Sequence, residues 1–276
     1  TQQYRSDGYV LAVVGVPKQN IGRNGVIAIK VNEGHISNVI YDGEKPQDTV
    51  TNLVDTYVGK IKDANPLKAD VLERYLLLIN DLPGNKARAL LRPSATEPGG
   101  TDLVISYNHK YIDGMASIEN RGSKYLGRWQ GSATVAANSV LGMNERTAVR
   151  VLAAAPVSEM RYYEIQHEQQ LGSEGTRVQF NASHVKSQPG DALTPLEIKG
   201  KSDNFRAFVF SPILRSRLQN LTVRGGVDVQ NNSTDLLGSS FSNDRIRSLR
   251  AGAQYDVTDS AGGINQADIQ ISRSEE

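Results

Sequence analysis

Hydrophobic and polar positions follow two different periods along this chain. Around residues 70–81 the apolar residues recur at helical spacing, with Leu72, Leu76 and Ile79 on one face and Asp70 near the start. Pro83 and Gly84 cannot continue that helix. From residue 111 onward, apolar and polar residues alternate, which is typical of strands with one apolar face. The pattern predicts an α+β domain followed by an all-β region.

The α+β domain is expected to follow the order strand, helix, helix, strand, strand. Its predicted elements are a strand over Ile36–Tyr41 with a turn at Asp42-Gly43, a helix from about Gln47 to Lys60, the helix that contains Leu72, and strands over Lys86–Arg92 and Thr101–Lys110. Two β-branched runs precede the domain, Tyr9–Val16 and Gly25–Val31, after a helix end at Tyr4–Gly8. These runs predict a hairpin with a long loop.

The all-β region contains about nine predicted strands. They cover residues 113–119, 125–138, 146–155, 160–171, 176–187, 200–211, 218–230, 245–257 and 264–272. A soluble β-sandwich would show the same alternation, so the connections must distinguish the two architectures. Turns at one rim are short, whereas two long polar loops, Gln188–Lys199 and Asn231–Asp244, lie at the other. This asymmetry favours an outer-membrane β-barrel.

Composition narrows the function classes without choosing among them. The 276 residues include 31 basic and 30 acidic side chains, and the net charge of +1 gives no argument for a nucleic-acid partner. There are no cysteines, which excludes disulfides and thiolate metal sites within this sequence. No apolar run reaches the length of a spanning helix, and the first residues do not form a signal peptide. Barrel strands alternate apolar with polar residues and need no long apolar run, so these observations remain compatible with a membrane protein.

Several short motifs resemble those of one family of bacterial transporters. Asn65-Pro66-Leu67-Lys68, Leu72-Glu73-Arg74 and Asn80-Asp81-Leu82-Pro83-Gly84 resemble the second POTRA domain of two-partner secretion transporters, outer-membrane proteins of Gram-negative bacteria that export haemolysins and filamentous adhesins. Asp7-Gly8-Tyr9 and Val31-Asn32-Glu33-Gly34 resemble the closing half of the first POTRA domain. Residues 119–127 and 211–221 are similar to a first barrel hairpin and a later turn-and-strand.

The resemblance implies a fold class and three regions. We expect the C-terminal half of a first POTRA domain over residues 1–34, a second POTRA domain over 35–110, and the N-terminal part of an antiparallel transmembrane β-barrel over 111–276. The family's barrel has more strands than the nine placed here. The chain is therefore expected to be a fragment with two open sheet edges, which cannot form a stable pore by itself.

The resemblance also implies a polypeptide-binding edge. In the family the second strand of the POTRA domain is an unpaired edge, which corresponds here to Ala87, Arg88, Ala89, Leu90, Leu91 and Arg92. An extended substrate would add to this edge as a further strand, with Arg88 and Arg92 selecting acidic segments and the Leu72 helix forming the other groove wall. The run Tyr9–Val14, with Tyr9, Leu11 and Val13, is a second candidate edge.

Arginines within the predicted strands raise the question of which face they occupy. Facing lipid, each would cost up to roughly 2–4 kcal/mol near the midplane. Turned inward they would line a wet, positive lumen suited to an extended polypeptide, although a soluble sheet would also expose them on its polar face. The residues are Arg150, Arg161, Arg177, Arg206, Arg224 and Arg250, of which Arg150, Arg177, Arg224 and Arg250 are the lumen candidates.

Covalent chemistry finds little support in the sequence. The four histidines are far apart, and His167-Glu168 lacks the second histidine of a zinc-protease helix. Glu164 and Glu168, on one side of a strand, would lie about 13 Å apart, too far for paired acid–base work. No glycine-rich phosphate loop occurs. We therefore expect no catalytic, metal or cofactor residues, no nucleotide and no enzyme.

The expected function is translocation of one large secreted protein of the haemolysin or adhesin type. The partners would be that protein, as an unfolded substrate, and outer-membrane lipid, with the POTRA domains in the periplasm. Two alternatives remain open. One is a POTRA-barrel assembly factor that inserts other barrels into the membrane. The other is a soluble periplasmic β-rich binding module with a sandwich fold.

Overall fold

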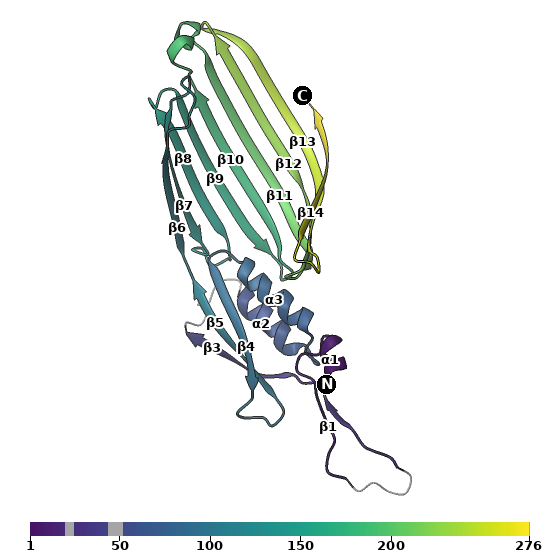
Figure 1. The fold of residues 1–276 in the computed structure, drawn as a ribbon. Coiled ribbons are helices and arrows are strands. Elements are labelled where there is room, and N and C mark those ends of the chain that lie inside the picture. Colours follow the sequence, from purple (N-terminus) through teal and green to yellow (C-terminus); the bar gives the residue numbers. More distant parts are fainter. Residues whose placement is uncertain (20–24, 44–51, 276) are drawn as a thin grey trace. The chain divides into compact units, whose positions relative to one another are not determined.

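The computed structural model describes residues 1–19, 25–43 and 52–275. The chain divides into two compact units, which are described separately. The first unit comprises Thr1–His109 with Arg215–Arg217, and the second comprises Lys110–Leu214 and Leu218–Glu276. Figure 1 shows helices in the first unit and a large sheet in the second.

The first unit contains the predicted order of strand, two helices and two strands. The elements are β3 (Ile36–Gly43), α2 (Leu53–Asp63), α3 (Ala69–Asp81), β4 (Asn85–Pro93) and β5 (Thr101–His109). The strand order is β3-β5-β4, in which β3 runs parallel to β5 and β4 runs antiparallel to it. Asp42 and Gly43, predicted as a turn, end β3 instead.

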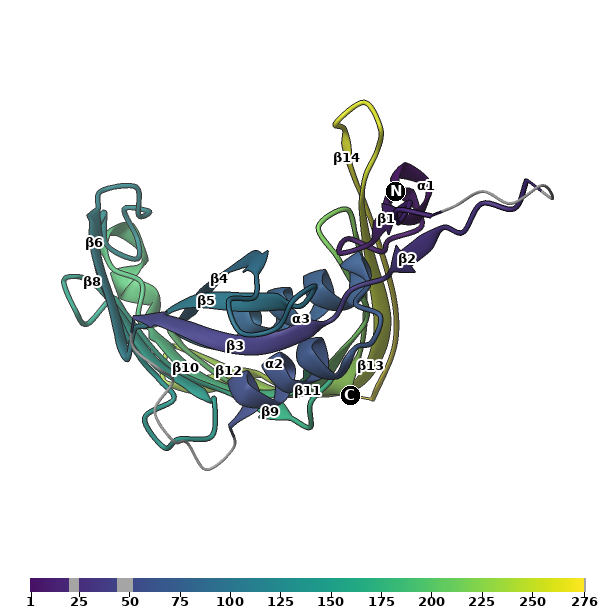
Figure 2. The same ribbon diagram turned by 90° about the horizontal axis from the view of Figure 1, so that it is seen from below.

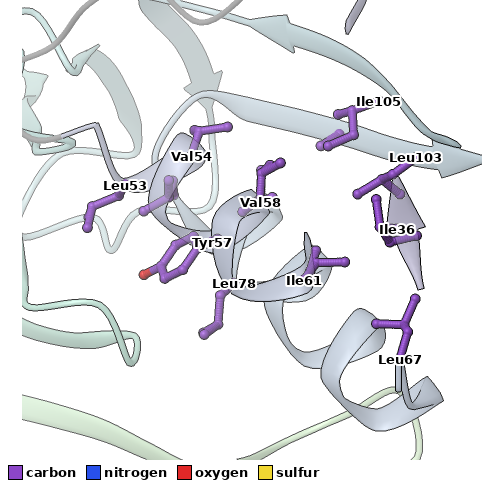
Figure 3. Close-up of a cluster of buried hydrophobic side chains, with 13 residues drawn as sticks. Ile36, Leu53, Val54, Tyr57, Val58, Ile61, Leu67, Leu78, Leu103 and Ile105 are labelled. Atoms are coloured by element: carbon purple, nitrogen blue, oxygen red, sulfur yellow. The ribbon is translucent and has the colours of Figure 1, made fainter. Parts of the chain in front are cut away.

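A single hydrophobic core lies between the two helices and this sheet (Figure 3). Ile79 is fully buried, as its place on the predicted apolar face requires, while Leu72 and Leu76 are half-buried. Leu78, outside the predicted face, is also buried. Because α3 packs against both α2 and β4, its buried face is wider than the face that contacts the sheet alone. Burial of each such side chain contributes roughly 1.5–3 kcal/mol before entropy is subtracted.

The helix ends follow local chemistry. The Asn52 side chain accepts a hydrogen bond from the Asp55 N–H at 3.3 Å and caps α2. The predicted helix start near Gln47 lies outside the described residues, and α2 continues to Asp63. α3 ends before Gly84, which adopts a positive φ of 76°. No helix among the described residues is long and apolar enough to cross a membrane.

The N-terminal segment contains much less strand than its β-branched runs predict. After α1 (Gln2–Ser6), β1 covers only Val13–Gly15 and β2 only Lys30–Asn32. The prediction of strand over residues 9–12, at residue 16 and over residues 25–29 is therefore wrong. These two short strands pair only with each other among the described residues, and Val26, Ile27 and Ile29 stay exposed. Strand propensity depends on packing against neighbours, which these residues do not have.

The second unit is one antiparallel sheet of nine strands in sequence order, which confirms the predicted strand number. Its strands are β6 (Ile112–Glu119), β7 (Trp129–Asn138), β8 (Arg146–Ala155), β9 (Met160–Leu171), β10 (Thr176–Ser187), β11 (Lys199–Arg215), β12 (Gln219–Leu236), β13 (Ser239–Thr258) and β14 (Ile264–Glu275). Within the described residues the sheet is open, with β6 and β14 at its edges. Figure 2 shows the sheet bent into an arc between them.

One of the two predicted long loops is absent. β12 and β13 have 18 and 20 residues, and only Leu237 and Gly238 separate them, both at positive φ. The loop prediction for residues 231–244 is wrong. Polar residues can pair as neighbouring strands even where apolar and polar side chains do not alternate, if neither face of those strands contacts an apolar surface. The other connection, between β10 and β11, is a loop that contains a short 3-10 helix, η1 (Asp191–Leu196).

The sandwich alternative is also wrong. A sandwich needs two facing sheets with a dry core between them, whereas this unit is a single sheet. The buried hydrophobic residues of its described part are only Ala136, Ala148 and Ala154. Neither face of the sheet carries a sealed apolar layer of the kind that stabilises a soluble domain.

Candidate functional site

β4 lies at an edge of the three-stranded sheet, because among the described residues it pairs with β5 alone. Along an antiparallel edge strand, every second residue directs its N–H and C=O away from the neighbouring strand. At the end of β4, Ser94 N–H donates to the Gly100 carbonyl at 2.9 Å, so even-numbered positions face β5. The outward-pointing backbone groups therefore belong to odd-numbered residues, including Ala87, Ala89 and Leu91.

The side-chain amide of Asn80 hydrogen-bonds the outward-pointing backbone groups of Ala87. Ala87 N–H donates to Asn80 Oδ1 at 2.9 Å, and Asn80 Nδ2 donates to the Ala87 carbonyl at 3.0 Å. The same amide nitrogen also donates to the Leu76 carbonyl at 2.8 Å, which anchors it to α3. The primary amide thus completes the hydrogen bonding of Ala87 as an added strand would. The backbone open to a further strand begins at Ala89.

The side chains of β4 alternate between the core and the solvent. Ala87 is buried, and Ala89 and Leu91 pack partly buried against the core. Arg88, Leu90 and Arg92 are exposed, and Leu90 has 64% of its surface accessible. An added strand would therefore lie beside small apolar side chains on one face and beside an Arg-Leu-Arg alternation on the other.

A hollow of about 420 Å³ opens at the far end of this edge. Leu91 and Arg92 line one side, and Val10, Leu11 and Val13 line the other. The structure thus brings together the two segments that the sequence singled out separately. Of the second candidate edge, only Val13 and Val14 are in a strand, and Leu11 lies in a turn before β1.

Tyr9 occupies a different position from the one predicted. Its N–H donates to the Tyr4 carbonyl at 2.9 Å, and its ring contacts the Tyr4 ring edge-on, with centroids 5.7 Å apart. The Lys68 ammonium lies 5.4 Å from the same ring centroid. The prediction that Tyr9 belongs to an edge strand is wrong, because this residue continues the turn that follows α1.

Charge at the edge is partly compensated. Arg92 Nε lies 3.9 Å from Asp102 Oδ2 on β5, and Asp102 is buried. Asn38 Nδ2 donates to Asp102 Oδ1 at 2.9 Å, and this bond, helped by the nearby Arg92 guanidinium, holds the pKa of the carboxyl below its usual range. Arg88 forms no ion pair with the described part of the chain, so it is the more available cation at this edge.

In the second unit, the pairing register assigns each arginine to a face, since directly opposite residues in an antiparallel pair point to the same side. Arg150 is opposite Glu164, Asn181 is opposite Arg206, and Gly226 is opposite Arg250. The Arg206–Asp228 ion pair shows that the even-numbered residues of β11 and β12 share a face. Together with the register of the other strands, this places one set of arginines on a common face, namely Arg150, Arg177, Arg206, Arg224 and Arg250. Arg161, which was not among the lumen candidates, lies on the opposite face.

Four of the five arginines on the common face are paired with acids, whereas the guanidinium of Arg150 lies over the Tyr162 ring, 5.9 Å from its centroid. Asp228, which is buried, lies 3.2 Å from Arg206 Nε and 3.3 Å from Arg250 Nη2. Arg224 binds both carboxylate oxygens of Asp268, at 2.7 and 2.8 Å. Glu168 lies 3.5 Å from Arg177 Nε. This face therefore carries compensated charge rather than the strongly positive surface that the sequence indicated.

The two faces of the sheet differ in crowding. The buried strand residues of the described second unit all lie on the arginine face, namely Ala136, Asn138, Ala148, Ala154, Gln170, Pro212, Asp228 and Ser248. Side chains converge on the inner side of a bent sheet, so this face is the concave one. The convex face exposes apolar side chains, among them Val149, Ile165, Phe205, Val227, Leu249 and Ile271. An exposed apolar surface of this extent marks contact with lipid or protein.

Sequence reasoning missed Asn80 and Asp228 as functional positions. Asn80 was noted only as part of a motif that resembles a family pattern, and its link to Ala87 depends on how α3 packs against β4. Asp228 could have been found from parity, since it alternates with Val227 and Val229 and therefore shares a face with Arg224. Among the described residues, no group of three or more histidines and carboxylates is placed to hold a metal ion.

Comparison with curated proteins finds relatives named as transporters. The chain is 24% identical over 234 residues to the heme/hemopexin transporter protein HuxB of Haemophilus influenzae strain 86-028NP. The match covers 83% of this chain and 40% of the relative, so the chain spans less than half the length of that protein. A transporter as relative agrees with the prediction that the chain is not an enzyme.

Comparison with solved structures shows the fold. The chain is similar to CdiB from Escherichia coli, with a TM-score of 0.77 and 18% identity over 100% of this chain and 51% of that one. It is also similar to CdiB from Acinetobacter baumannii, with a TM-score of 0.67 and 13% identity over 99% and 52%. BamA from Haemophilus ducreyi, solved without its POTRA domains 1–3, matches with a TM-score of 0.54 and 9% identity over 99% and 55%.

The family match covers a large part of the chain. The family described as haemolysin secretion/activation protein ShlB/FhaC/HecB matches residues 99–274, which is more than half of the sequence and covers the nine strands of the large sheet except the last residue of β14. The match agrees with the motifs at residues 119–127 and 211–221. This chain therefore belongs to the ShlB/FhaC/HecB family of haemolysin secretion/activation proteins, the two-partner secretion outer-membrane transporters that its sequence resembles.

Proposed function

We propose that this chain is part of an outer-membrane transporter that captures one large secreted protein in unfolded form and passes it through a β-barrel. In this proposal residues 35–110 are a periplasmic POTRA domain and residues 1–34 the closing half of another. Residues 111–276 are the first strands of the barrel. The observation that carries the proposal is the distribution of side chains over the large sheet. Apolar side chains lie on its convex face, and paired polar side chains lie on its concave face.

Membrane placement follows from the energetics of the two faces. Apolar residues such as Val149, Ile165 and Leu249 would meet lipid, and the arginine face would line a water-filled lumen. An arginine turned to lipid near the midplane would cost roughly 2–4 kcal/mol. Strands β7 to β14 have 10 to 20 residues, enough for the 9–11 that a tilted spanning strand needs. The open edges at β6 and β14 would pair with further strands of the whole protein.

Substrate capture would use the open part of the β4 edge. Ala89 and Leu91 offer their N–H and C=O groups, which is about four hydrogen bonds at roughly 0.5–1.5 kcal/mol each. Ordering of the substrate reduces this gain, so the binding would be weak and reversible. Transport requires such binding, because a tightly held segment would not move on. The hollow beside Leu91 would receive an apolar substrate side chain at the end of the added strand.

Disulfide trapping tests the capture step, because the sequence contains no cysteine. Leu90→Cys places a thiol on the exposed side of the β4 edge, and Lys62→Cys on α2 serves as the matched exposed control. Each variant of the full-length transporter would be oxidised with secreted partner that carries single cysteines. We expect cross-links at Leu90→Cys and none at Lys62→Cys, since paired strands bring β-carbons close enough for a disulfide. Equal cross-linking at both positions would contradict capture at this edge.

Insertion of other barrels into the membrane is a second candidate, favoured by the fold likeness to BamA. The same trapping experiment separates the two functions. A secretion transporter is expected to cross-link with its exported partner, whereas an insertase would cross-link with strands of other outer-membrane proteins. The family match supports the first outcome.

A further inference from the structure

A row of three basic residues crosses the convex face of the sheet. In the register, Arg161 on β9 is directly opposite Lys186 on β10, and Lys186 is directly opposite Lys201 on β11. All three side chains are exposed. They lie beside the connections at residues 156–159 and 188–198, at the rim that carries the longer loops.

This arrangement is unfavourable without an anion. Directly opposite residues on neighbouring strands have β-carbons about 4.5–5.5 Å apart, and like charges at that spacing repel. None of the three forms an ion pair with the described part of the chain. The carboxylate of Asp203, two residues along β11 from Lys201, is already engaged by His184 Nδ1 at 2.5 Å. The row thus combines three positive charges with no acidic partner among the described residues.

An apolar hollow lies next to the row, toward the middle of the sheet. Its volume is about 550 Å³, and its lining includes Val149, Ile165, Ala182, Phe205 and Val229. The register orders the features: the basic row comes first, then Tyr163, His184 and Asp203, then Ile165, Ala182 and Phe205. A cationic rim followed by an apolar hollow matches a molecule with an anionic head and a hydrocarbon tail.

We propose that Arg161, Lys186 and Lys201 bind the phosphate groups of an acylated, phosphorylated lipid, with an acyl chain in the hollow below. A phosphate carries more charge than a carboxylate and several acceptor oxygens, so one group can satisfy more than one cation. Because the row lies at the long-loop rim, the lipid belongs to the outward leaflet of the membrane. This inference rests on the membrane placement proposed above and is independent of substrate capture at β4.

The test uses the full-length transporter in detergent, titrated with diphosphoryl lipid A and followed by native mass spectrometry. The variant carries Arg161→Gln, Lys186→Gln and Lys201→Gln. The matched control removes three exposed cations of the first unit, through Lys18→Gln, Lys30→Gln and Lys62→Gln. Near a membrane surface each basic residue contributes about a fivefold factor to binding of anionic lipid, so we expect roughly 100-fold weaker binding in the variant and no change in the control.

Three further arms complete the test. Lys186→Gln alone removes the middle charge and should weaken binding about fivefold, even if the triple variant does not fold. Dephosphorylated lipid A should bind as weakly to the unmodified protein as diphosphoryl lipid A does to the variant. Inorganic phosphate should not displace the lipid. The proposal would be overturned if the triple variant and Lys186→Gln bound diphosphoryl lipid A as tightly as the unmodified protein does. It would also be overturned if the unmodified protein bound dephosphorylated and diphosphoryl lipid A equally, or if free phosphate displaced the lipid. Unchanged outer-membrane fractionation of the variants keeps this result separate from the membrane placement itself.

Discussion

Proline at position 89 tests the capture edge most directly. The N–H of Ala89 points away from β5, so a proline there removes one outward donor and leaves the β4–β5 pairing intact. At position 90 the N–H faces β5, so Leu90→Pro breaks the sheet and should unfold the domain. The two neighbouring substitutions therefore separate an effect on the edge from an effect on folding.

The size of the effect follows from the number of groups that remain open. The side-chain amide of Asn80 already hydrogen-bonds the outward N–H and C=O of Ala87. The backbone groups of Ala89 and Leu91 remain for a substrate, which gives about four hydrogen bonds worth roughly 2–6 kcal/mol together. Ala89→Pro removes one of them and leaves a substrate carbonyl without a donor. We expect a loss of roughly 1–3 kcal/mol, which weakens binding about 5- to 150-fold.

Fluorescence anisotropy would measure this loss with the full-length transporter and a labelled peptide from the secreted partner. Ala89→Ser retains the N–H and the small side chain and serves as the matched control. Circular dichroism and thermal unfolding would verify that Ala89→Pro is folded. Equal affinity of the proline and serine variants, with folding retained in both, would refute strand addition at this edge.

Three further outcomes are expected. Asn80→Ala frees the backbone of Ala87 and should lower stability by about 1–2 kcal/mol in thermal unfolding while it tightens peptide binding in the anisotropy assay; weaker binding would contradict the role given to this amide. Asp228→Asn leaves two arginines without their carboxylate and should lower the temperature at which the folded barrel band is lost in gel electrophoresis, whereas an unchanged temperature would mean the ion pairs contribute nothing. The lowered pKa of Asp102 stabilises the fold at pH values above its unfolded value of about 3.9, and this contribution is lost as the pH falls through the lower folded value. The protection factors of the β5 amides, which correct for the slower intrinsic exchange at acid pH, should therefore fall on acidification, and less so in Asn38→Ala; an equal fall in both proteins would exclude that hydrogen bond as the cause.

The sequence predicted the elements of both units where packing and periodicity agree. Ile79 was assigned to the core because its spacing matches one helical face, and the nine strands were located because their residues alternate. Val26 and Ile27 were assigned to a strand on composition alone, and the structure leaves them exposed because no sheet receives them. Strand propensity without a partner does not determine a strand.

The candidate site was only partly predictable. Parity within a strand gives the face of an arginine relative to its neighbours on that strand. Only the register between strands shows that Arg150 and Arg161 lie on opposite faces of the sheet. The bonds between Asn80 and Ala87 depend on the packing of α3 beside β4, which no local pattern reveals. Local chemistry predicts elements, whereas contacts between elements require the assembled structure.

The β12–β13 hairpin gives the proposed transporter a part that is accessible from outside the cell. A strand of 20 residues extends roughly 66 Å at 3.3 Å per residue, about twice the thickness of the hydrocarbon layer even before tilt is considered. In the proposed placement its tip at Leu237 and Gly238 stands in water beyond the lipid headgroups. The Leu237 N–H donates to the Leu196 carbonyl of the η1 loop at 3.0 Å, so the hairpin tip and that loop would together form the surface that antibodies, bacteriophages and proteases meet.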